Sequence, residues 1–118
     1  MYNILICDDE KDIVSALSIY LSTENYNIFT AYTGQQALDI VAKHDIHLIL
    51  MDIKMPNLDG LEATKIIREL SPTVPIIAQS AYAYQQDQIA AMDAGCSDFI
   101  AKPISQAKLK DMINKWLP

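Results

Sequence analysis

The chain has 118 residues, 51% of them hydrophobic and 20% charged, with a formal net charge of −6 at pH 7. The length and composition predict one globular domain. The acidic balance argues against a nucleic-acid surface, which needs clustered Lys and Arg, and no apolar run approaches the ~20 residues of a membrane span. With no signal peptide and no paired cysteine motif, we expect a cytoplasmic protein without direct membrane contact.

The first half of the chain alternates short apolar runs with stretches of helical periodicity. Strands are expected at residues 2–7, 26–31 and 48–52. A helix should follow Glu10 and end near Glu24, and a second should begin at Thr33-Gly34 with Thr33 as its N-cap. The run 48–51 is uninterrupted by polar residues, which is typical of a central strand buried on both faces.

The second half repeats this alternation. Strands are expected at 76–79 and 99–101, with helices after the 52–60 loop, at 85–94 and from Ser105 onward. Ser71-Pro72 and Gly95 should end the first two of these helices, and the polar start of the 85–94 helix suggests a lightly anchored element. The helix after the 52–60 loop has an apolar face made of Ala63, Ile66, Ile67 and Leu70. The helix from Ser105 has one made of Leu109, Met112, Ile113 and Trp116.

The order strand–helix, five times over with short connections, predicts the fold. Such alternation gives a parallel sheet with helices on both faces and right-handed crossovers. We therefore predict an α/β, flavodoxin-like (βα)5 three-layer sandwich over residues 1–118, with five parallel strands in the order 2-1-3-4-5. The first and third strands are neighbours in this order, at the switch point where open α/β sheets bind ligands.

Polar residues stand where four of these strands end: Asp8-Asp9, Asp52, Ser80 and Lys102. Each close pair of like charges costs about 4 kcal/mol at an effective dielectric near 20. Converging carboxylates therefore either hold a proton or recruit a cation, and their hard oxygens select Mg²⁺ or Mn²⁺. Asp52 could then attack a phosphoryl group held by Lys102 and Ser80, which gives an aspartyl phosphate. Each residue alone is more often a cap, turn or surface residue, but their joint placement favours the functional interpretation.

Four segments of the chain resemble the receiver domain of two-component response regulators. They are Ile4-Leu5-Ile6-Cys7-Asp8-Asp9-Glu10, the 50–60 stretch from Leu50 to Gly60, Ser80-Ala81, and Phe99-Ile100-Ala101-Lys102-Pro103. The resemblance covers the whole chain. It implies a cis Lys102-Pro103 bond and the following roles: Asp52 as phosphoacceptor, Asp9 as direct Mg²⁺ ligand, Asp8 as ligand through water, Lys54 as backbone-carbonyl ligand, Lys102 as phosphate-binding cation, and Ser80 and Phe99 as the switch pair.

The resemblance further implies a phosphorylation-controlled switch that catalyses only its own phosphorylation and dephosphorylation. The phosphoryl donor would be the phosphohistidine of a histidine kinase or of a histidine phosphotransfer protein, or a small acyl phosphate. Phosphorylation would draw Ser80 inward, and Phe99 would follow. The surface made by the fourth helix, the fifth strand and the last helix would then change its partners.

Two local features bear on kinetics. The switch strand reads Ala78-Gln79-Ser80, where a more apolar residue and Thr are commoner in the family. Lys54 and Tyr82, two residues beyond Asp52 and Ser80, flank the path of an attacking water. We hypothesise that they tune hydrolysis, with the bulky Tyr82 shielding the aspartyl phosphate.

Segments 51–56, 61–64, 81–83 and 115–118 are similar in sequence to the corresponding segments of receivers fused to hybrid sensor histidine kinases. The chain stops just after its last helix, as an excised domain would. On this interpretation it is the cytoplasmic part of a membrane-anchored sensor kinase, and the kinase activity lies outside it.

Three other classes of protein were weighed. A flavodoxin-like cofactor binder needs phosphate-cradling loops, and three glycines form neither G-x-G-x-x-G nor a P-loop. A haloacid-dehalogenase-type phosphatase would have a second Asp two residues after its nucleophile, where this chain has Lys54. A degenerate receiver acting as a constitutive interaction module is disfavoured by the intact acidic set, Ser80 and Lys102.

Overall fold

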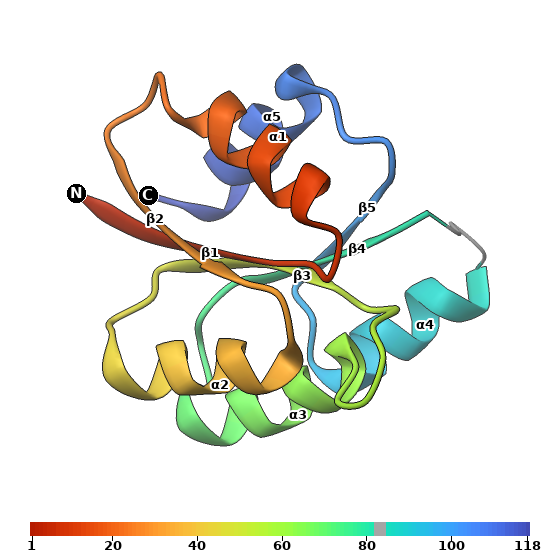
Figure 1. Ribbon diagram of the computed structural model, residues 1–118. Coiled ribbons are helices and arrows are strands. Elements are labelled where there is room, and N and C mark those ends of the chain that lie inside the picture. Colours follow the sequence, from red (N-terminus) through yellow and green to blue (C-terminus); the bar gives the residue numbers. More distant parts are fainter. Residues whose placement is uncertain (82–84) are drawn as a thin grey trace.

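The computed structural model describes residues 1–81 and 85–118, and within them strands and helices alternate along the chain (Figure 1). The elements are β1 (Tyr2–Cys7), α1 (Lys11–Leu21), β2 (Tyr26–Ala31), α2 (Gly34–Lys43), β3 (Leu48–Asp52), α3 (Gly60–Leu70), β4 (Ile76–Ser80), α4 (Gln85–Ala94), β5 (Asp98–Ala101) and α5 (Gln106–Trp116).

The five strands form one parallel sheet in the order β2-β1-β3-β4-β5, as the sequence predicts. The register aligns Cys7 with Met51, and Asp52 with Gln79. Ser80 is level with Ala101. The carboxyl ends of β1, β3, β4 and β5 therefore meet at one rim, and the polar residues that follow them are brought together there.

Helices cover both faces of the sheet (Figure 1). α2, α3 and α4 lie on one face over a core that includes Leu5, Met51 and Ile67. α1 and α5 lie on the other, over a core that includes Leu50 and Leu109. Every residue of β3 and of β4 is buried, which confirms that the 48–52 run is a central strand.

Several local predictions are confirmed. The Thr33 hydroxyl accepts a hydrogen bond from the Gln36 N–H at 3.0 Å and so caps α2. Gly95 has φ +113°, a left-handed conformation that suits glycine at a helix end. The Lys102-Pro103 bond is cis.

Two predictions about helices differ from the structure. α1 ends at Leu21 rather than near Glu24, because the N–H and hydroxyl of Ser22 both donate to the Ile19 carbonyl and close the last turn. Ile66 and Leu70, assigned from the sequence to the same apolar face as Ala63 and Ile67, are 38% and 54% exposed. The side of α3 that packs on the sheet consists of Gly60, Ala63, Thr64 and Ile67. Small residues let the helix approach on this side, so Ile66 and Leu70 lie at its margin.

Gly60 allows α3 to begin directly against the end of β3. A Cβ at this position would overlap the carbonyl oxygen of Asp52 and would lie 2.7 Å from the Ile53 Cα. Both of these are backbone atoms, which cannot move aside as a side chain can. The hydrogen bond from the Glu62 N–H to the Asp59 carboxylate, at 3.0 Å, fixes the start of the same helix. Gly60 and Asp59 thus hold the segment that carries Asp52.

We predict that Gly60→Ala destabilises the protein by about 2 kcal/mol or more, because an added methyl group in a closely packed place forces backbone shifts. Urea unfolding followed by circular dichroism measures the effect. Glu69→Ala, an exposed change on the same helix, should stay within roughly 0.5 kcal/mol of wild type. Equal stability of Gly60→Ala and wild type would contradict this account of the β3–α3 junction.

Candidate functional site

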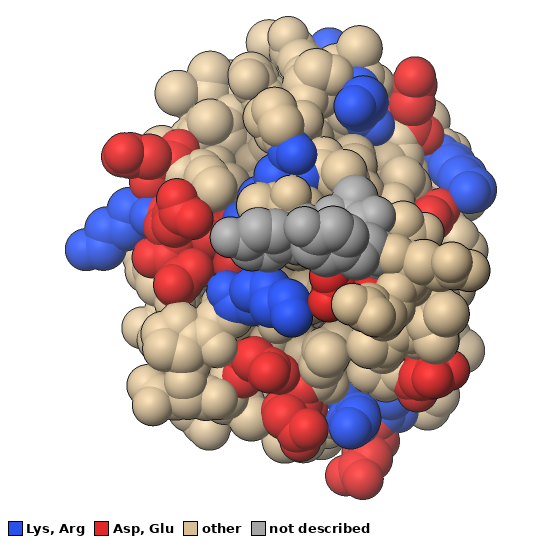
Figure 2. Space-filling view, turned by 90° about the vertical axis from the view of Figure 1, so that its right-hand side faces the viewer, with Lys and Arg blue, Asp and Glu red and all other residues tan. Residues whose placement is uncertain are grey.

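Three charged side chains from different strand ends meet at the rim of the sheet. On the face of the molecule in Figure 2, acidic and basic side chains lie close together around its centre. The Lys102 Nζ lies 2.8 Å from Asp8 Oδ2 and 3.6 Å from Asp52 Oδ1. All three side chains are nearly excluded from water, with exposed fractions of 11% for Lys102, 0% for Asp8 and 4% for Asp52. The convergence predicted from the sequence is therefore present in the described part of the chain.

The electrostatics of this cluster are unbalanced, since one ammonium faces two carboxylates. Burial, followed by repulsion from Asp8, raises the pKa of Asp52 to about 7, against the opposing effects of Lys102 and the Lys54 N–H. Burial lowers the pKa of Lys102, but its contacts with Asp8 and Asp52 outweigh this and raise the pKa overall. Lys102 is therefore charged at neutral pH, whereas Asp52 is ionised in only part of the molecules.

A second group of acids lies beside this cluster. Carboxylate oxygens of Asp8, Asp9 and Glu10 lie within 4.8 Å of one another. The Glu10 N–H donates to Asp8 Oδ1 at 3.0 Å, which fixes the turn after β1. Asp8 is buried, whereas Asp9 and Glu10 are exposed. This donor set of hard oxygens fits a divalent cation such as Mg²⁺. Glu10 was not among the predicted ligands, although it stands third in an acidic run.

Lys54 contacts Asp52 through its backbone and α4 through its side chain. Its N–H donates to Asp52 Oδ1 at 3.2 Å. Its ammonium lies 3.3 Å from Asp87 Oδ1, in the first turn of α4. Sequence reasoning missed Asp87, because nothing in the spacing shows that α4 begins within reach of the loop after β3.

Ser80 and Phe99, the predicted switch pair, lie on the same face of adjacent strands. Ala78 pairs with Phe99, and Ser80 stands two residues after Ala78, so Ser80 shares its face. Ser80 is buried, and Phe99 packs against the core under α2, α3 and α4. The Lys102 N–H donates to the Ser80 carbonyl at 2.8 Å, which ties the two strand ends together. Tyr82, predicted to tune hydrolysis, lies outside the described residues.

Gln79 is a buried amide in the middle of the sheet, level with Asp52. Its Nε2 donates to the Cys7 carbonyl at 3.5 Å, a long hydrogen bond. Its Oε1 has no hydrogen-bond partner among the residues that the structure describes. Such an orphaned acceptor costs about 1–3 kcal/mol.

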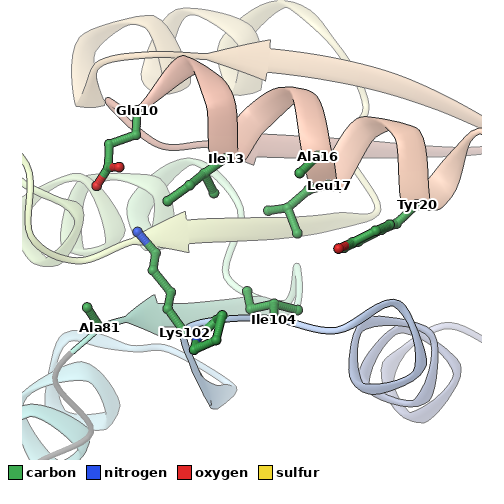
Figure 3. Close-up of a pocket in the computed structure, with 9 residues that line it drawn as sticks. Glu10, Ile13, Ala16, Leu17, Tyr20, Ala81, Lys102 and Ile104 are labelled. Carbon is green, nitrogen blue, oxygen red and sulfur yellow. The ribbon is translucent and has the colours of Figure 1, made fainter.

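A groove of about 440 Å³ runs from the charged cluster between α1 and the loop after β5 (Figure 3). Its walls are mostly apolar, with Ile13 and Leu17 from α1 and Ile104 from the loop. Glu10 and Lys102 stand at the end nearest the acidic site, with the Lys102 ammonium directed toward Glu10 (Figure 3). The groove was not predicted, since it depends on how α1 and the loop are placed.

Comparison with known proteins assigns the family. Residues 4–114 match the family model of the response regulator receiver domain, so the chain belongs to this family of phospho-signalling switches. The response regulator ArlR of Staphylococcus aureus is 38% identical over 109 residues, which are 92% of this chain and 49% of ArlR. The chain thus spans about half the length of the curated relatives it matches.

Three solved receivers show the same fold. The chemotaxis protein CheY4 of Vibrio cholerae has a TM-score of 0.95 and 25% identity, over 99% of each chain. The receiver domain of sensor histidine kinase PA1611 from Pseudomonas aeruginosa, with magnesium coordinated in its active site cleft, has a TM-score of 0.90 and 32% identity over 98% of this chain and 96% of that one. The Saccharomyces cerevisiae Ssk1 receiver was crystallised with the histidine phosphotransfer protein Ypd1. It has a TM-score of 0.92 and 31% identity, over 98% of this chain and 88% of that one.

A membrane-crossing helix is absent from the described residues, none of whose helices combines the needed length and apolar character.

The raised pKa of Asp52 gives a prediction about stability in the absence of metal. The folded state binds an extra proton between about pH 4 and 7, so the free energy of unfolding falls as pH rises through this window. Asp52→Asn removes the effect and should be more stable than wild type near pH 8, by at most ~4 kcal/mol, with the difference shrinking toward pH 5.

Urea unfolding in EDTA at several pH values measures this difference. Asp111→Asn, a change of an exposed acid on α5, is the matched control and should follow wild type throughout. A difference between Asp52→Asn and wild type that did not vary with pH would be evidence against a raised pKa.

The orphaned acceptor of Gln79 gives a second prediction. Gln79→Met keeps the length of the side chain and removes the unpaired oxygen at the cost of one long hydrogen bond. We expect it to raise the free energy of unfolding by roughly 1 kcal/mol, as a higher urea midpoint at unchanged m-value. A loss of stability in Gln79→Met would show that the amide has a partner, such as a bound water.

Proposed function

We propose that residues 1–118 form a single receiver domain in which Asp52 accepts a phosphoryl group in a Mg²⁺-dependent reaction. The observation that carries this proposal is the Lys102 ammonium, held between the buried carboxylates of Asp8 and Asp52. A buried ammonium beside a carboxylate nucleophile is suited to binding the equatorial oxygens of a transferring phosphoryl group.

The chain's own residues would act as follows. Asp52, in its ionised form, attacks phosphorus with a carboxylate oxygen, and the bond from phosphorus to the donor nitrogen breaks as the P–O bond forms. Lys102 stabilises the negative charge on the phosphoryl oxygens, and the Ser80 hydroxyl donates a hydrogen bond to one of them. The Lys54 N–H, which already contacts Asp52 Oδ1, orients the nucleophile.

The acidic group would hold the metal. Asp9, Asp52 and the backbone carbonyl of Lys54 are the proposed direct ligands, with Asp8 acting through water, and Mn²⁺ would suit the same oxygens. A bound Mg²⁺ supplies positive charge that offsets the carboxylates and the developing phosphoryl charge. The magnesium ion in the cleft of the PA1611 receiver supports this assignment.

The donor would be a histidine kinase or a histidine phosphotransfer protein. The groove between α1 and the loop after β5 supports this, because it leads to Lys102 and presents an apolar wall suited to a helix of a partner. The complex of the Ssk1 receiver with Ypd1 gives a relative with such a partner. Neither nucleic acid nor a membrane is proposed as a direct contact. We propose a cytoplasmic location. The resemblance to receivers of hybrid sensor kinases supports attachment to such a kinase, whose kinase activity would then lie outside this chain.

Phosphorylation would change a surface on the other side of the site. The added charge at Asp52 attracts the Ser80 hydroxyl, and Phe99 on the adjacent strand moves into the space that Ser80 leaves. The surface made by α4, β5 and α5 then presents a different set of side chains to a downstream effector. A shift from 1:99 to 99:1 requires about 5.5 kcal/mol, which a new ion pair, metal contact and hydrogen bond are of the right order to supply.

Incubation with acetyl phosphate and Mg²⁺, followed by intact mass spectrometry, tests the proposal. We expect one labile phosphoryl adduct in wild type and in Asp111→Asn, none in Asp52→Asn, and none when EDTA replaces Mg²⁺. Lys102→Met should form the adduct at least tenfold more slowly, because it lacks the cation at the phosphoryl oxygens. An adduct in Asp52→Asn equal to that of wild type would disprove the assignment of the acceptor.

A further inference from the structure

Two contacts of Lys54 connect the proposed phosphoacceptor with α4. The backbone N–H of Lys54 donates to Asp52 Oδ1 at 3.2 Å, and its ammonium lies 3.3 Å from Asp87 Oδ1. The Asp87 side chain is 16% exposed, so the ion pair is partly shielded from water. One residue therefore touches both the carboxylate of Asp52 and the first turn of α4.

Among the described residues, α4 buries little apolar surface. Its buried residues are Ala91 and Ala94, while Ile89 and Met92 are about half exposed. Two alanines bury little apolar area, so the packing that holds this helix is weak. The Lys54–Asp87 ion pair therefore contributes to holding the first turn of this helix.

Lys54 is free to change partner. Its side chain is 56% exposed, so it is not packed in one orientation. It also leaves the main chain two residues after Asp52, beside the point where a phosphoryl group would add charge. After losing the ammonium, Asp87 would keep the stabilisation that the helix dipole gives to an acid in the first turn.

We propose that Asp87 is a positioning residue that holds the Lys54 ammonium, and that phosphorylation of Asp52 competes for this ammonium and loosens the first turn of α4. The inference rests on the proposed function, since it requires an aspartyl phosphate. A phosphorylated carboxyl carries close to two negative charges where the free carboxylate carries one, so the ammonium is drawn from Asp87 toward it. Phosphorylation thereby reaches α4 by a route separate from Ser80 and Phe99.

Hydrogen–deuterium exchange of the 85–94 helix, with and without Mg²⁺ and acetyl phosphate, tests this inference. In wild type we expect phosphorylation to raise exchange in the first turn roughly two- to fivefold, the range for partly exposed ion pairs. Asp87→Asn and Lys54→Met should each show this raised exchange before phosphorylation and little further change after it. Asp87→Glu, which keeps the charge, should restore the wild-type response.

Asp93→Asn is the matched control, because Asp93 is an exposed acid of the same helix without an ion pair among the described residues. It should respond to phosphorylation as wild type does. The double variant Asp87→Asn/Lys54→Met should exchange no faster than either single variant, since both remove the same contact. Additive effects would instead mean that each residue holds α4 separately, and would overturn the inference.

Intact mass of the same samples separates the two proposals. Absence of an adduct in wild type overturns the proposed function, and with it this inference. An adduct in wild type and in Asp87→Asn, with the same rise in α4 exchange in both, overturns the inference alone.

Discussion

The structure depends on the burial of one ammonium between two carboxylates at the end of a parallel sheet. Isolated charges are strongly disfavoured in such a place, and Lys102 compensates Asp8 and Asp52 only in part. Burial, followed by repulsion from Asp8, raises the pKa of Asp52, and a second acidic group lies beside this cluster. A divalent cation, as in the proposed function, would supply the positive charge that this arrangement lacks.

The topology of the sheet is what permits this arrangement. β1 and β3 are neighbours because the chain reverses its direction of winding between them, so Asp8 and Asp52 come from adjacent strand ends. β4 and β5 follow on the other side of β3, which brings Ser80 and Lys102 to the same rim. Gly60 then lets α3 begin against the backbone of Asp52. Short connections therefore fix the position of Asp52 at the rim of the sheet.

Most of the fold could be predicted from the sequence, because it depends on patterns that survive without tertiary information. Apolar runs and helical periodicity predict the order of strands and helices. The polar residues at the ends of the strands predict that Asp8, Asp52 and Lys102 lie together. The errors concern which side of a helix faces the sheet, because this depends on how the helix is rotated about its axis. The spacing of Ile66 and Leu70 fits a buried face, but α3 packs on the sheet with another side. Local spacing could not reveal Asp87 either, since its contact with Lys54 joins elements 33 residues apart in the numbering (54 to 87).

The helices on the two faces of the sheet differ in the size of the side chains that they bury, and this difference bears on which helix a change at Asp52 can move. α1 and α5 bury large side chains such as Leu17, Leu109 and Ile113, whereas α4 buries only alanines among its described contacts with the core. Moving a large buried side chain into water costs about 1.5–3 kcal/mol, so a few such residues already match the ~5.5 kcal/mol that complete switching requires. On the proposed function, a charge change at Asp52 would therefore shift α4 more readily than α1 or α5. The weakly packed α4, which contacts the loop after β3 through Asp87, would be the element that phosphorylation moves, and the firmly packed α1 beside the groove would stay a fixed surface for a phosphodonor.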